Sequence, residues 1–388
     1  MKRRLIGVGS VFAAGALLLT LNGCASGADP GTEAVNSTQA ELLTLPGAWY
    51  TTTPHFAWCT VNSASPTPTC VVPFSHNSLG GSNTVVKLTT GRYRVTMPGM
   101  AFNGNPQAVA LGTSHHCHSN TFGTTGSGVV IDVACRTAAG AMTDGSFVVT
   151  YVREFNTGGV LGAYARVLGS FGGAPIVNDT WNSTGGAIAA TRITAGQYNV
   201  DFAGQAATAD TVLVTAASTG LPGHCKARTW GAIAGAVRVT VDCYTPAGAY
   251  QDNDFTISYG RNIRGDARNT TPSGTQGGFS RVTAGGAVNP TFSRNSCVAG
   301  SNTSTHPAVG TYADTIHVVA ASPMYSLPNV ALTMAVGPGP SYCNLSSLWS
   351  TSLPTSDPIV NVRCFNTAGA AQDNEHNSSF MLQAPSGC

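Results

Sequence analysis

Charged side chains are scarce in this chain. Asp, Glu, Lys and Arg make up 9% of its 388 residues, against about a quarter in ordinary soluble proteins. The 19 basic and 17 acidic residues give a formal net charge of +2, and removal of Lys2, Arg3 and Arg4 with a signal segment leaves 16 basic against 17 acidic, or −1. No basic stripe remains, which excludes a nucleic-acid partner and an anionic lipid surface. The hydrophobic fraction of 42% argues against disorder.

Hydrolase motifs are also missing. The chain contains no G-x-S-x-G elbow, no H-E-x-x-H zinc helix and no phosphate loop. We therefore nominate no catalytic residue and expect a non-catalytic protein. Because Ser, His and Asp are plentiful, a secreted hydrolase with a site assembled from loops between modules stays as the alternative.

A sustained 3.6-residue apolar period is absent beyond the first 21 residues. Strict alternation replaces it: Tyr93, Val95 and Met97 alternate with polar neighbours, and residues 237–243 do the same. Period two indicates half-buried strands, because successive side chains of a strand point to opposite faces. Turn-rich stretches of Gly, Pro, Asn and Ser separate the strands, so we predict an all-β, jelly-roll-like sandwich.

One cysteine pair recurs three times, each followed by a Gly five residues after the second Cys and an Asp four residues later. The copies are Cys117/Cys135 with Gly140 and Asp144, Cys225/Cys243 with Gly248 and Asp252, and Cys343/Cys364 with Gly369 and Asp373. Such self-similarity predicts tandem modules. We assign 1–23 to a signal peptide, 24–44 to a flexible tether, and 45–155, 156–262 and 263–388 to three β-sandwich modules of about 105–115 residues.

Aromatic residues mark the equivalent starts of the modules. We place Trp49, Tyr164 and Phe279 at the same position, 115 residues apart. The third copy departs at its end: Phe380 follows Asp373 by seven residues, where the other copies have a Phe after three, and the closing Tyr is missing. We expect an atypical terminal copy, as is common in repeat proteins.

Eleven cysteines make an odd number, and assigning Cys24 to a lipid leaves ten for five disulfides. The repeats predict Cys117–Cys135, Cys225–Cys243 and Cys343–Cys364, the short spacing predicts Cys59–Cys70, and Cys297–Cys388 remains. Each loop of about 18 residues should contribute roughly 3 kcal/mol in the chain-entropy model. Disulfides imply an oxidising compartment.

The N-terminus has the charge, length and order of a signal peptide: Lys2, Arg3 and Arg4 precede an apolar run from Leu5 to Leu21. The run ends at Leu21-Asn22-Gly23-Cys24, which resembles the lipobox of bacterial lipoproteins, with Asn22 departing from the usual small or apolar residue. The resemblance covers about 24 residues and implies cleavage before Cys24 and its acylation. Without an Asp after the Cys, it implies the outer membrane in a Gram-negative cell.

Three features invite ligand hypotheses. His116 and His118 would share one face of a strand and could hold a transition metal, but Cys117 is expected in a disulfide, and exposed loop histidines without a metal are the interpretation that we favour. The acidic turns at Asp144, Asp252 and Asp373 suggest Ca²⁺, although Asp is also a common turn residue. Trp230 lies between paired cysteines, and we place it with Phe122 and Trp349 in exposed loops. There it could stack on a sugar, or it could cover the disulfide as a lid, which is the interpretation that we favour.

These observations predict an exported, lipid-anchored bacterial protein of the cell envelope. The modules resemble repeats of uncharacterised secreted and surface β proteins of bacteria, which implies an architecture and no activity. We expect binding, adhesion or envelope structure, with a carbohydrate or a surface protein as the ligand, since loops on a rigid scaffold suit such roles. No cofactor is expected beyond the Ca²⁺ alternative.

Overall fold

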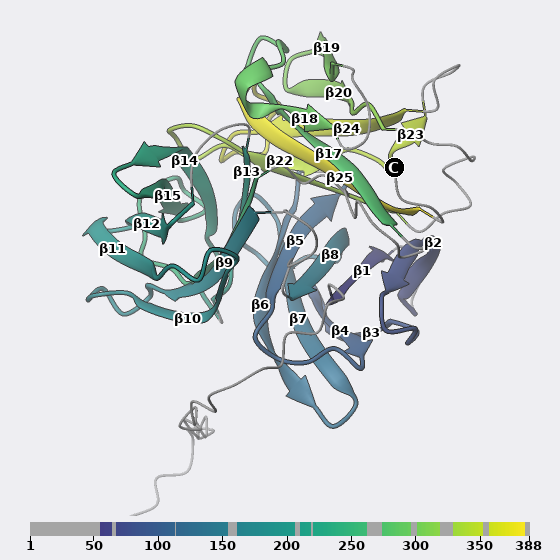
Figure 1. Ribbon diagram of the computed structural model, residues 1–388. Helices are drawn as coiled ribbons and strands as arrows, with labels where there is room; N and C mark the ends of the chain where they lie inside the picture. Colours follow the sequence, from purple (N-terminus) through teal and green to yellow (C-terminus); the bar gives the residue numbers. More distant parts are fainter. Residues whose placement is uncertain are drawn as a thin grey trace, which may run out of the picture. The chain divides into compact units, whose positions relative to one another are not determined.

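The computed structural model describes residues 55–63, 67–112, 114–153, 161–205, 210–218, 220–261, 274–295, 301–318, 329–351 and 357–384. Apart from one 3-10 turn, η1 (Pro290–Phe292), the regular elements of these residues are β-strands (Figure 1). No helix in this part of the chain is long and apolar enough to span a membrane. The predicted all-β class is therefore confirmed. Cys24, Trp49, Cys297 and Cys388 lie outside the described residues.

The first repeat forms two four-stranded antiparallel sheets. One has the order β2-β1-β8-β5 and the other β3-β4-β7-β6. Hairpin partners β1–β2 and β3–β4 each stay in one sheet, so the strand order differs from the alternation between sheets of a jelly roll. The strands are β1 (His55–Asn62), β2 (Thr69–Asn77), β3 (Thr84–Thr89), β4 (Arg92–Pro98), β5 (Asn105–Leu111), β6 (His116–Thr125), β7 (Gly128–Arg136) and β8 (Ser146–Arg153).

The second repeat reproduces this arrangement strand for strand. Its sheets have the orders β10-β9-β16-β13 and β11-β12-β15-β14. The strands are β9 (Leu161–Leu168), β10 (Ile176–Asn182), β11 (Ile188–Thr194), β12 (Gln197–Ala203), β13 (Asp210–Ala216), β14 (His224–Ile233), β15 (Ala236–Tyr244) and β16 (Phe255–Arg261).

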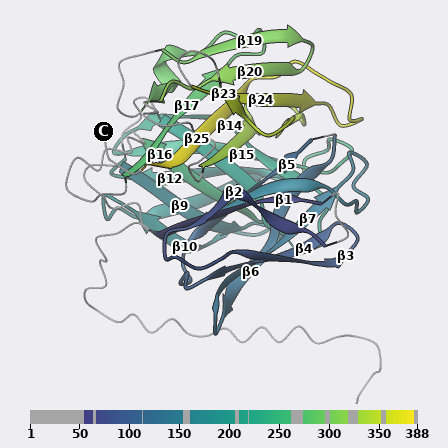
Figure 2. The ribbon, with the colours of Figure 1, turned by 90° about the vertical axis from the view of Figure 1, so that its right-hand side faces the viewer.

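The third repeat has the sheet β18-β17-β25-β21 and the strand order β19-β20-β24-β22, with β23 also paired to β24. Figure 2 shows β19, β20 and β24 as neighbouring strands. The strands are β17 (Gly274–Val282), β18 (Arg294–Asn295), β19 (Thr303–Ala308), β20 (Thr311–Thr315), β21 (Asn329–Ala335), β22 (Tyr342–Leu345), β23 (Ser350–Thr351), β24 (Pro358–Phe365) and β25 (His376–Ala384).

Apolar alternation packs the two sheets of each repeat together. In β4 the buried positions are Tyr93, Val95 and Met97, while Arg92 and Arg94 are exposed and Thr96 is half-buried, as period two predicts. In the first repeat these side chains share a core with inward residues of β1, β5, β7 and β8. Each repeat is thus a sandwich of two sheets.

Four of the predicted disulfides are present: Cys59–Cys70, Cys117–Cys135, Cys225–Cys243 and Cys343–Cys364. The last three connect equivalent strand pairs, β6–β7, β14–β15 and β22–β24, in which the two cysteines are direct register partners. The recurring cysteine pair of the sequence therefore occupies the same strand register in each repeat.

Register corrects two of the sequence assignments. Trp58, not Trp49, is equivalent to Tyr164 and Phe279, because each pairs with a residue one position before the closing aromatic of the last strand. In that last strand, His376 takes the place of Phe147 and Phe255, and Phe380 takes the place of the closing tyrosines Tyr151 and Tyr259. The third copy therefore keeps the spacing of the last strand, but a histidine replaces a phenylalanine and a phenylalanine replaces the closing tyrosine.

The three repeats pack against one another and are not independent modules. The described residues belong to one compact unit, and β22 of the third repeat pairs in parallel with β5 of the first at Leu345 and Leu111, joining two sheets into one of nine strands. The core of the third repeat includes Trp58 and Val109 from the first. First and last repeats are therefore in direct contact.

Candidate functional site: the axis between the repeats

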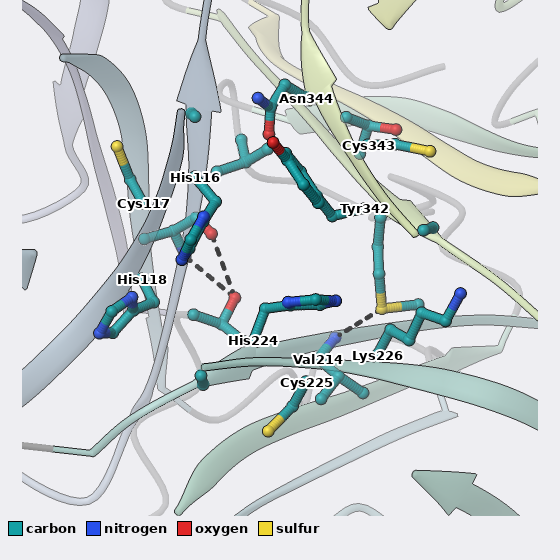
Figure 3. A pocket seen from close by; sticks show the side chains of 18 residues that line it. His116, Cys117, His118, Val214, His224, Cys225, Lys226, Tyr342, Cys343 and Asn344 are labelled. Carbon is teal, nitrogen blue, oxygen red and sulfur yellow. Dashed lines mark hydrogen bonds between the residues drawn. The ribbon is translucent and has the colours of Figure 1, made fainter. Parts of the chain in front are cut away.

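A pocket of about 60 Å³ lies where the three repeats meet (Figure 3). Each repeat contributes six residues to its wall, from equivalent positions on two strands. The lining residues are 108–110 and 116–118, then 214–216 and 224–226, then 333–335 and 342–344. Equivalent residues facing one space are what an approximate threefold axis requires, so we call this the axial pocket.

Three rings form a triangle at the axis. The ring centroids of His116, His224 and Tyr342 lie 6.0, 5.6 and 5.6 Å apart. They begin the equivalent strands β6, β14 and β22, and Figure 3 shows them reaching toward a common space. The near-equal edges of the triangle follow from the equivalence of the three positions.

Each ring hydrogen-bonds a backbone carbonyl of the next repeat. His116 Nε2 lies 3.4 Å from the Pro222 oxygen, His224 has a backbone bond with Pro340, and the Tyr342 hydroxyl donates to the Ser114 oxygen. The acceptors each lie two residues before the ring of their own repeat. The bonds run from first to second, second to third and third to first repeat, so the circle closes.

The repeated glycine packs at the same interfaces. Gly140, Gly248 and Gly369 have φ of 88°, 88° and 75°, a region that residues with a Cβ rarely adopt. A Cβ at Gly140 would lie 2.6 Å from Pro246 Cγ, and one at Gly248 2.9 Å from Pro340 Cγ. The glycine noticed in the sequence is therefore required both by its backbone and by the neighbouring repeat.

The equivalent aromatic residues Phe122, Trp230 and Trp349 are not exposed. Trp230 lies in β14 with 5% of its surface accessible, and its indole Nε1 donates to Asp210 at 2.7 Å. Each ring packs on the next repeat: Phe122 under Arg166, Trp230 against Phe292 at 5.5 Å, and Trp349 against Phe74 at 5.1 Å. This packing leaves Trp230 no free face for a sugar, which corrects the exposed-loop expectation.

None of the three histidines around the axis is exposed, which corrects the expectation of exposed loop residues. His116 and His118 are 6% and 3% exposed, and His224 is half-buried. Burial lowers the pKa of His116 to about 4 and the pKa values of His118 and His224 to about 3, because a charged imidazole loses its hydration there. We call these three the axial histidines; at neutral pH they are uncharged.

Lys226 occupies the position of His118 in the second repeat and is 1% exposed. Its ammonium group donates to Ser341 of the third repeat at 3.1 Å. Burial lowers its pKa to about 8. Asn344, the third equivalent, donates to the His115 oxygen of the first repeat. The second layer of the axis thus also links neighbouring repeats.

The three repeated aspartates bind their own hairpins. Each carboxylate accepts the backbone N–H of the glycine just before strand β4, β12 or β20: Asp144 from Gly91, Asp252 from Gly196 and Asp373 from Gly310. A cationic or imidazole group of the neighbouring strand contacts each as well. Ca²⁺ would have to displace these partners, so the geometry gives the aspartates a role in the turn.

One cluster has metal-ligand composition, His115 with Cys117 and Cys135. The two sulfurs form a disulfide, and metal ligation needs a thiolate. The cluster therefore offers a single imidazole.

Among the described residues, Asp314, His376 and Ser378 bring together the three residue types of a catalytic triad. His376 Nε2 and Ser378 Oγ lie 2.7 and 2.8 Å from the same carboxylate oxygen of Asp314. In a working triad the histidine stands between the nucleophile and the acid. Here both contact the acid, and all three are 0% exposed. The cluster is a buried polar core.

Sequence reasoning missed the axis because its residues belong to three distant segments. The available signal was positional: His116, His224 and Tyr342 each stand one residue before the first cysteine of a pair. Comparisons with protein-family models, with curated proteins and with solved structures found no match.

Proposed function

We propose that this is an exported, lipid-anchored bacterial protein of the cell envelope with a non-catalytic binding, adhesion or structural role. The observation that carries the proposal is the equivalent disulfide in each of the three sandwiches. Such bonds form and persist in oxidising compartments outside the cytoplasm. A rigid scaffold that holds loops in place suits a binding role.

The packing of the repeats refines how binding would be organised. Some residues that an independent module would expose to solvent, such as Trp230 and Gly248, are covered by the next repeat. A ligand would thus be bound by the assembled unit, and an isolated repeat would expose apolar interface instead. Loss of binding on dissection would consequently not distinguish this role from an enzyme.

Anchoring is tested by replacing Cys24 with Ser in the full chain and expressing it in a bacterial host with a labelled palmitate precursor. We expect the unaltered chain to be labelled and to sediment with membranes. The Cys24→Ser chain should be exported without the label and should leave the membrane fraction. Equal labelling of both chains, or an unlabelled parent chain, would contradict the lipid anchor.

A further inference from the structure

Two imidazoles of the axial triangle have nitrogen lone pairs that no group in the described structure uses. A carbonyl oxygen only accepts, so His116 donates its Nε2 proton to Pro222 and carries the lone pair on Nδ1. That Nδ1 is buried without a partner, and so is Nε2 of His224. The carbonyl of Pro340 fixes the other nitrogen of His224 in the same way.

This is how metal-binding histidines are arranged: one ring N–H is held by a carbonyl and the other nitrogen is free to ligate. A buried acceptor without a hydrogen-bond partner destabilises the fold unless a ligand or water satisfies it. The axial pocket of about 60 Å³ lies beside these nitrogens, with room for an ion or a few waters.

The two rings are slightly farther apart than two imidazoles bound to one ion. Two imidazoles bound tetrahedrally, with metal–nitrogen distances of about 2 Å, have their ring centroids about 5 Å apart. The centroids of His116 and His224 are 6.0 Å apart.

We propose that the axial pocket binds a divalent transition-metal ion through His116 Nδ1 and His224 Nε2, with solvent completing its coordination. No carboxylate lines the pocket, and imidazole alone suits zinc, copper or nickel rather than calcium or magnesium. The neighbouring cations have other contacts: Arg136 donates to the Gly140 oxygen at 2.9 Å and Lys226 to Ser341. An ion here would tie the first repeat to the second, a property that goes beyond the proposed function and stands or falls independently of it.

The third repeat supplies the test variants. Tyr342 fills the equivalent position with a ring that donates to a carbonyl and offers no imidazole nitrogen. His116→Tyr and His224→Tyr should therefore keep the packing and remove the ligands. The matched control is His306→Gln, which alters a histidine on the hairpin β19–β20, paired with Asp373 away from the axis.

Ni²⁺ and Zn²⁺ are titrated into the oxidised full chain at pH 7.5, with calorimetry and thermal unfolding as readouts. We expect one ion per chain and a raised melting temperature. Affinity should fall at least tenfold in each Tyr variant and remain unchanged in His306→Gln. No stoichiometric binding, or binding retained in the double variant, would overturn the proposal. If the variants unfold, the Co²⁺ absorption spectrum of the unaltered chain decides, and a spectrum without nitrogen ligation would equally reject the site.

Discussion

The third sandwich has a buried polar cluster at positions that are apolar in the other two. Replacing this cluster with the apolar residues of the first repeat tests whether these positions are structurally equivalent. Asp314 accepts hydrogen bonds from His376, Ser378 and Ser304, the last at 2.7 Å. Register places apolar residues at the three buried positions in the other repeats: Val95, Phe147 and Val149 in the first, and Val200, Phe255 and Ile257 in the second.

Asp314→Val alone should destabilise the chain by about 3–5 kcal/mol, because it leaves buried polar groups without their partner. The triple variant Asp314→Val, His376→Phe and Ser378→Val recreates the core of the first repeat. Replacing a buried polar cluster with apolar residues of similar volume is often neutral or stabilising by about 1–4 kcal/mol. The two added substitutions should therefore rescue the first.

The free energy of unfolding is measured by urea titration of the oxidised chain at pH 7. Asp201→Asn is the control: it removes a carboxylate of a surface pair with Arg238, where a loss of at most about 1 kcal/mol is expected. A triple variant as unstable as the single one would show that the three positions are not equivalent to the apolar trio. A harmless Asp314→Val would refute the argument about buried partners.

Three further outcomes are expected. Gly248→Ala should destabilise by about 2 kcal/mol more than Gly235→Ala in urea titration, since both have positive φ but only Gly248 has a neighbouring repeat within 4 Å; equal effects would contradict the interface. Burial lowers the pKa of the three axial histidines from 6.5, so the unfolded state binds more protons than the folded state below about pH 6.5. The free energy of unfolding should therefore fall from there toward pH 4 by up to about 1.4 kcal/mol per pH unit for each histidine. A flat profile of stability against pH in acid would argue against their burial. Replacing Cys225 and Cys243 by Ser should lower the free energy of unfolding by about 3 kcal/mol, and an unchanged urea midpoint would show that this bond does not constrain the chain.

Local patterns predicted the all-β class and four disulfides of the described residues. Alternation along β4 and β15 follows from the geometry of a single strand, and Cys117 and Cys135 face each other because neighbouring strands pair in register. Such features need only a short stretch of sequence. Their agreement with the structure is therefore expected from the period of a strand and from disulfide spacing.

The contacts between repeats could not be predicted in this way. Trp230 sits on a strand face that an isolated sandwich would expose, and Phe292 and Arg281 of the following repeat cover it. His376 was overlooked as the equivalent of Phe147 because a polar residue breaks the apolar pattern there. In both cases the residues that contact the side chain are remote in sequence, so neither strand propensity nor apolar periodicity predicts the contact.

Closure of the three repeats into one unit is tested most directly by cutting the chain between them. Protease sites are placed in segments 154–160 and 262–273, and the cleaved, oxidised protein is examined by size-exclusion chromatography with light scattering. The four disulfides of the described residues each join cysteines of a single repeat, so no bond among them crosses a cut. We predict one species with the mass of the uncut chain; separation into three independent fragments would contradict the threefold packing.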